Sequence, residues 1–223
     1  WEFFMLYLAV TLGFFVENQR EHLVERSREK EFMISLIKDL KSDTLQLSRL
    51  KIYRQNRLRN IDSIFMFFLE HPGGSVPVYG YTLASRLFGH AAFFQNSGTL
   101  DQLKNSGGLR LIRQRNVVDS IESYDQQIKR MALRDIYETN FFVDMNKVSQ
   151  NLFDSRDLLK IYVDTANYKK LNTPFKTIKL NEQYLNEFLN SIRTLQLTVN
   201  QNQDLQITIK DKATRLINLI QKE

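Results

Sequence analysis

The chain carries three histidines, but their surroundings offer little for metal binding or acid–base chemistry. His22 lies in a charged stretch, His71 directly precedes a proline, and His90 lies in an apolar stretch. None has a second histidine or a pair of carboxylates at the spacing of metal ligands, so we expect no metal site and no cofactor. The lack of cysteine excludes disulfides and thiolate chemistry. We interpret His90 as a partly buried structural residue.

Two glycine pairs, at residues 73–74 and 107–108, could be mistaken for phosphate-binding loops. Neither is followed by the Lys-Ser/Thr pair of a P-loop or preceded by a strand pattern, so we interpret both as helix breaks. Acidic residues such as Asp39 and Asp43 are spread along helical stretches, and we interpret them as solvated helix surface. The sequence therefore predicts no enzymatic activity.

The best candidate for a nucleic-acid contact is the basic stretch 51–60. It carries Lys51, Arg54, Arg57 and Arg59 near Tyr53. The formal net charge is +6, but the basic residues are interleaved with acidic ones along the whole chain and are not concentrated in this stretch. We therefore favour a solvated surface, or a contact to an acidic neighbouring chain, and expect no nucleic acid as a partner.

The first residues of the chain form its most distinctive pattern. Residues 3–16 contain no charged side chain, whereas the next fifteen are mostly charged or amide. A bilayer span needs about 20 apolar residues, and the chain begins at Trp1 rather than Met, so we expect upstream residues to complete the span. A core helix and a signal peptide are the alternatives. We predict a transmembrane anchor over residues 1–17, with lipid contacts from Trp1, Phe3, Phe4, Leu6, Tyr7, Leu8, Val10, Leu12, Phe14, Phe15 and Val16.

Three long stretches beyond the anchor have the spacing of amphipathic helices. The first continues from Glu17 to about Glu70, the second runs from Val117 to about Asp164, and the third begins after a capping asparagine at 181. Each apolar stripe has polar interruptions: Lys51 and Arg54, then Asp135 and Glu138, then Asn202. We expect Arg54 to need an acidic partner or an exposed head group, and Asn202 to fix register.

These elements predict an all-α fold. An anchor helix continues into an elongated antiparallel bundle of three long helices over residues 18–223. Residues 71–115 are predicted to form a cap of short helices, one of them over 82–94. In such an up-down-up bundle the C-terminus lies far from the membrane, and the loop 165–180 returns to it. Possible lipid contacts in that loop are Tyr168, Lys169, Lys170, Phe175 and Lys176.

Two passages resemble uncharacterised single-pass inner-membrane proteins of Bacteroidetes. The first is the opening AVTLGFFVENQREHLVERSREKEFMISLIKDLKSD, and the second is SGTLDQLKNSGGLRLIRQRNVVDSIESYDQQI at residues 97–128. In the second passage Leu103, Gly107, Gly108, Leu109 and Ile112 match a particular turn. The resemblance implies an inner-membrane protein, and it brings no activity and no functional residues.

We therefore expect a non-catalytic, membrane-anchored scaffold or accessory subunit of a cell-envelope complex. Protein partners or further copies would bind along an association seam of Ile192, Val199, Asn202 and Ile209. The flank after the anchor lacks a positive excess, so the bulk of the chain is expected in the periplasm. A periplasmic sensor or ligand-binding module and a lipid- or cell-wall-binding protein are the alternatives.

Overall fold

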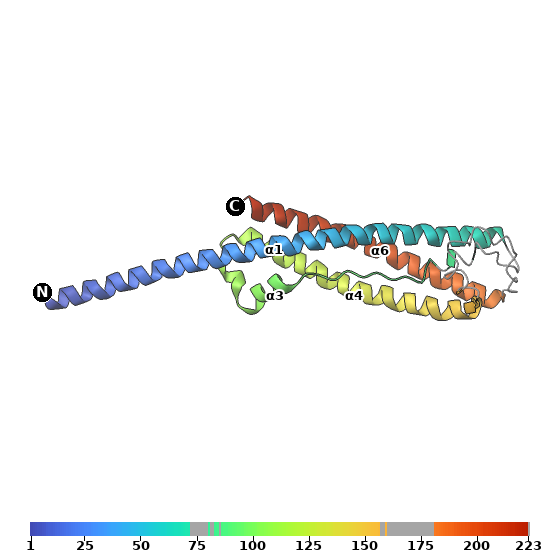
Figure 1. Cartoon of the computed structure of the whole chain (residues 1–223), viewed down its shortest axis with the longest axis horizontal. Helices are drawn as coiled ribbons and strands as arrows, with labels where there is room; N and C mark the ends of the chain where they lie inside the picture. Colours follow the sequence, from blue (N-terminus) through green and yellow to red (C-terminus); the bar gives the residue numbers. More distant parts are fainter. Residues whose placement is uncertain (72–79, 81–82, 85, 157–158, 160–180, 223) are drawn as a thin grey trace. The chain divides into compact units, whose positions relative to one another are not determined.

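The protein is all-α in a computed structural model that describes residues 1–71, 80, 83–84, 86–156, 159 and 181–222 (Figure 1). Its elements are α1 (Glu2–Glu70), α3 (Gly98–Asn105), the 3-10 helix η1 (Gly108–Leu111), α4 (Arg115–Leu152) and α6 (Glu182–Gln221). The continuous first helix ending at Glu70 is confirmed. The cap of α6 is confirmed as well, because Asn181 Oδ1 accepts a hydrogen bond from the Gln183 amide at 2.8 Å.

The chain divides into two compact units, which we describe separately. Unit 1 contains residues 1–45, 94–126 and 210–223, and unit 2 contains residues 46–93 and 127–209. The segment 71–115, predicted to form a single cap, is therefore shared between the two units. The expected end of the second helix near Asp164 lies outside the described residues, and α4 itself ends at Leu152.

In unit 1 the helices α1 and α4 run in the same direction. Glu29 of α1 accepts a hydrogen bond from the amide of Arg113, just before α4, and Asp43 accepts one from Tyr124 within α4. Residue numbers thus rise together along both helices. The core of this unit is apolar and includes Leu36, Leu40, Leu103, Val117, Ile121 and Leu216.

Unit 2 shows the same parallel relation, with α6 antiparallel to both helices. Phe68 at the end of α1 and Phe153 just after α4 both pack edge-on against Phe188, near the start of α6. Farther along α6, Gln196 bonds Asp62 of α1, so residue numbers on α6 rise as those on α1 fall. The apolar core around these rings includes Ile61, Ile64, Leu87, Met145, Ile192, Leu195 and Val199.

The predicted up-down-up topology is therefore wrong, because the second long helix does not run back along the first. The segment between α1 and α4 makes the return instead. Residues 89–97 have no helix, which also corrects the helix expected over 82–94. The physical reason is that Arg57 donates hydrogen bonds to the carbonyl oxygens of Leu87 and Gly89. In a helix, those oxygens would accept hydrogen bonds from backbone amides of the same helix.

This topology also changes one related expectation. The C-terminal residues 210–221 of α6 belong to unit 1, the unit that contains the apolar start of α1, rather than to a distant end. The loop 165–180, expected beside the membrane, lies outside the described residues, as do its five possible lipid contacts.

The second glycine pair forms the tight turn between α3 and η1. Gly107 has a φ of 69°, in the left-handed region that glycine adopts without strain. A Cβ on Gly108 would lie 3.1 Å from Leu103 and 3.3 Å from the Phe32 ring, so the backbone approaches α1 closely there. The interpretation of this pair as a helix break is confirmed.

Candidate functional site

The polar residues that interrupt the three apolar stripes meet in unit 2. Arg54 comes from α1, Asp135 and Glu138 come from α4, and Asn202 and Gln206 come from α6. All five are buried. We call this set the polar layer.

Arg54 is the centre of the polar layer. Its Nη2 donates to Asp135 Oδ1 and to Glu138 Oε2, both at 2.8 Å, and its Nη1 donates to Gln206 Oε1 at 3.1 Å. Asn202 Nδ2 adds a second donor to Glu138 Oε2 at 2.7 Å. The side chains of Arg54 and Glu138 are 0% exposed, so this ion pair is held entirely away from water.

A second buried arginine extends the polar layer. The Arg57 guanidinium lies 5.1 Å from the ring centre of Phe142 and 5.6 Å from that of Tyr53. Its Nη1 is 3.7 Å from Glu138 Oε1, and neither atom has a hydrogen-bond partner among the described residues. Burial lowers the pKa of Arg57.

His90 borders the polar layer and is partly buried, as predicted. Its ring stacks on Phe142 at a centroid distance of 5.2 Å, and its Nε2 is 3.1 Å from the Thr139 hydroxyl oxygen. Burial lowers the pKa of His90, which favours the neutral ring.

The positions of these residues correct two predictions. The basic stretch 51–60 is not a uniformly solvated surface, because Arg54 and Arg57 are buried and pair with acids of their own chain. The predicted association seam is internal, since Ile192, Val199, Asn202 and Ile209 are each at most 1% exposed. They are therefore covered by their own bundle and are not available to a partner.

Asp43 in unit 1, which was predicted to be solvated, is a buried carboxylate. Its Oδ1 accepts hydrogen bonds from the backbone and side-chain amides of Asn96, at 2.9 and 2.7 Å. Its Oδ2 accepts one from the Tyr124 hydroxyl at 2.7 Å. Burial raises the pKa of Asp43, and these hydrogen bonds oppose that rise only in part. Asp43 thus holds the returning segment and α4 to α1.

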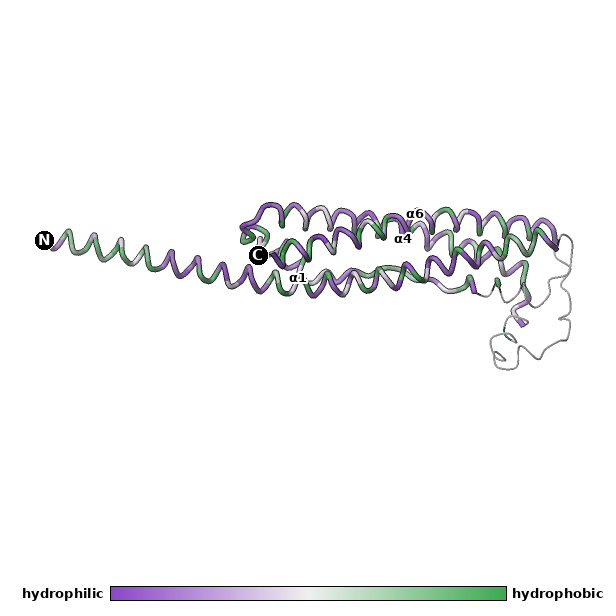
Figure 2. Tube along the Cα trace, turned by 90° about the horizontal axis from the view of Figure 1, so that it is seen from above, coloured by the Kyte–Doolittle hydropathy of each residue, from purple (hydrophilic) through white to green (hydrophobic). Residues whose placement is uncertain are grey.

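Of the residues predicted to contact lipid at the start of the chain, Trp1 directly precedes α1 and the others lie in its first turns. All are exposed. Trp1 is 99% exposed, Phe3 84% and Phe14 78%. Figure 2 shows this apolar stretch giving way to a polar one along the same helix. No helix in the part of the chain that the structure describes carries an apolar stretch long enough to cross a bilayer.

Comparisons with protein-family models, with characterised proteins and with solved structures found no match to the chain.

The pairing in the polar layer predicts a strong and rescuable stability defect. Arg54→Met leaves Asp135 and Glu138 buried without their main cation, so we expect a loss of about 3–5 kcal/mol in the free energy of unfolding. Adding Asp135→Asn and Glu138→Gln removes the uncompensated negative charge. We expect the triple variant to recover a substantial part of the loss in urea unfolding. If the triple variant is less stable than Arg54→Met, the proposed charge balance is wrong.

Asp43 predicts a pH dependence of stability. Because its pKa is raised on folding, its contribution to stability is fully present below the ordinary carboxyl pKa and is lost as the pH rises through the raised value. Asparagine can accept from Asn96 through its oxygen and donate through its amide nitrogen to the Tyr124 hydroxyl oxygen, without titrating. We therefore expect Asp43→Asn to gain stability relative to the wild type as the pH rises from about 4 towards neutrality. Urea unfolding at a series of pH values measures this difference, and a pH-independent difference would contradict the prediction.

Proposed function

We propose that this chain is a membrane-attached helical-bundle protein that serves as a scaffold or accessory subunit of a cell-envelope complex. The observation that carries the proposal is the exposed apolar segment, residues 3–16 of α1. Burial of one large apolar side chain stabilises by about 1.5–3 kcal/mol, so a membrane offers this segment a strong gain over water. The charged residues that follow would remain in water.

The resemblance to single-pass inner-membrane proteins supports the same location. The flank Glu17–Glu21 contains two glutamates and one arginine, so it lacks the positive excess of a cytoplasmic flank. We therefore infer an inner-membrane protein with one N-terminal membrane helix and with the bulk of its chain in the periplasm.

The scaffold role is supported by apolar surface elsewhere on the bundle. In unit 2, Leu133, Ile136 and Tyr137 are spaced to lie on one face of α4, and they are 62%, 57% and 62% exposed. This stripe, rather than the internal seam on α6, is the surface that we infer contacts a partner subunit.

Membrane attachment predicts a loss of vesicle binding when charge enters the apolar segment. We expect wild-type protein to bind phosphatidylcholine vesicles and Leu8→Glu/Leu12→Glu not to bind, because a charged residue inside a bilayer costs about 2.5–3.5 kcal/mol. Trp1 is the only tryptophan, so a blue shift of its emission reports insertion of this segment alone.

The matched control is Ile52→Glu/Leu133→Glu, which changes two exposed apolar residues of unit 2. It should bind vesicles as the wild type does. Equal binding by the apolar-segment variant, or an unshifted Trp1 emission in the wild type, would refute membrane attachment.

The scaffold role is tested on protein extracted from membranes in mild detergent. We expect a stoichiometric complex, with a partner or with further copies, by light scattering and mass spectrometry. Ile136→Asp should weaken it, whereas Asp144→Lys, a charge change at another exposed position of α4, should not. A monomer without a stoichiometric partner would refute the scaffold role and leave membrane attachment standing.

A further inference from the structure

Three arginines are brought to the polar part of α1 by the turn before α4. Arg110 lies in η1, Arg113 follows it, and Arg115 begins α4. Glu29 of α1 fixes this turn, since its carboxylate accepts a hydrogen bond from the Arg113 amide at 2.9 Å and lies 3.9 Å from the Arg113 Nε. The arginines therefore have a defined position beside α1 within unit 1.

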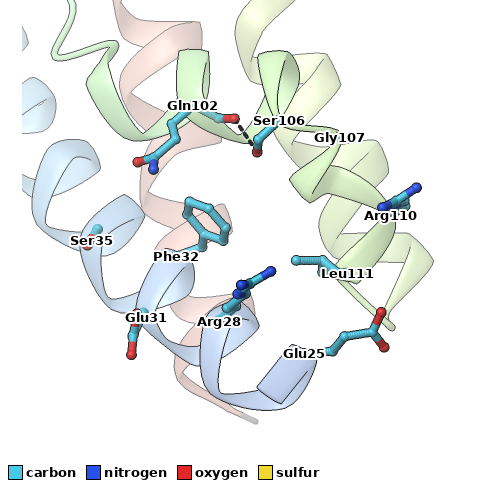
Figure 3. A pocket seen from close by; sticks show the side chains of 10 residues that line it. All are labelled: Glu25, Arg28, Glu31, Phe32, Ser35, Gln102, Ser106, Gly107, Arg110 and Leu111. Carbon is cyan, nitrogen blue, oxygen red and sulfur yellow. Dashed lines mark hydrogen bonds between the residues drawn. The ribbon is translucent and has the colours of Figure 1, made fainter. Parts of the chain in front are cut away.

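A groove of about 570 Å³ lies between this turn and α1. We call it the arginine groove; its lining includes Arg26, Arg110 and Arg113, with His22, Leu23 and Leu111. A neighbouring pocket of about 480 Å³ shares Glu25, Arg110 and Leu111 with it. Figure 3 shows Arg28 and Phe32 pointing into that pocket, while Arg110 points away from it.

The charge of the arginine groove favours an anion. Residues 17–31 of α1 alone contain five acidic and four basic side chains, so their net charge is negative. The three arginines at 110, 113 and 115 make the net charge of the two segments together positive. Glu25 also lines the groove and lies 3.8 Å from His22. Neither Arg26 nor Arg110 has a carboxylate partner within the described part of the chain. Their guanidinium groups are therefore free to bind a phosphate in a bidentate manner.

The arginine groove begins at the height of the headgroup layer and extends beyond it. Its α1 residues, 19–26, follow Val16 by about 5–15 Å along the helix axis, given a rise of about 1.5 Å per residue. A headgroup layer extends about 5–8 Å beyond the hydrocarbon core. Helix side chains lean towards the N-terminus, so Arg26 reaches back towards the apolar segment. Arg20, at the same level, is already paired with Glu17 at 2.5 Å.

We propose that the arginine groove binds a phosphate group, and that at the membrane this phosphate belongs to an anionic phospholipid headgroup. The inference rests on the proposed membrane attachment, because insertion of the apolar segment brings the groove to the headgroups. The arginine groove would give membrane attachment a preference for anionic phospholipids. The apolar segment alone would give no such preference.

The test compares binding of the full chain to phosphatidylcholine vesicles with and without phosphatidylglycerol. We expect wild-type protein to bind more tightly when phosphatidylglycerol is present. Arg26→Gln/Arg110→Gln should weaken binding to these anionic vesicles about 25-fold, since each arginine near an anionic surface strengthens binding about fivefold. Its binding to pure phosphatidylcholine should not change. Both residues are exposed, so the variant should melt as the wild type does.

The matched control is Arg49→Gln/Arg130→Gln, which removes two exposed arginines of unit 2. It should keep the preference for anionic vesicles. An equal loss in both double variants would show diffuse charge attraction and overturn the arginine groove as a site. Binding to both vesicle types without any preference would overturn the inference and leave membrane attachment standing.

Calorimetric titration with inorganic phosphate separates the two sources of the ligand. Binding of inorganic phosphate that Arg26→Gln/Arg110→Gln abolishes would support a phosphate site. If that result came with no binding to any vesicle, the lipid headgroup as source and the proposed membrane attachment would both be refuted.

Discussion

The fully buried charge of Arg54 constrains the organisation of unit 2. Arg54 has no exposed surface, and an unpaired charge in such a place costs several kcal/mol. The cost is offset only if α4 and α6 place Asp135, Glu138 and Gln206 at the correct height along α1. A shift of either helix by one turn, about 5.4 Å, would break these bonds. The apolar core would tolerate several registers, and the polar layer selects one.

Asp43, buried in unit 1, has the equivalent role with a different chemistry. Asp43 is held by amide and hydroxyl donors from the returning segment and from α4. In each unit a buried polar residue of α1 bonds partners on α4. These two residues therefore specify the register that the repeating apolar stripe leaves open.

The sequence allowed correct prediction of the long helices, because apolar spacing and the rarity of glycine and proline are local signals. It also identified Arg54, Asp135, Glu138 and Asn202 as interruptions of their stripes. Their mutual contact is not predicted by the sequence, because the spacing within one helix does not show which residues of another helix lie at the same height. The direction of α4 was missed because no local signal shows that an extended segment, rather than a helix, returns along the bundle. Arg57 and the carbonyl oxygens of Leu87 and Gly89 specify that segment only through tertiary contact.

The partners of Arg54 also determine when during synthesis on the ribosome the bundle can close. Asp135 and Glu138 are separated from Arg54 by 81 and 84 positions, and Gln206 by 152. Until those residues have been made, burial of the Arg54 charge has nothing to offset its cost, and the middle of α1 stays hydrated. Closure of the bundle around Arg54 therefore requires residues from all three long helices.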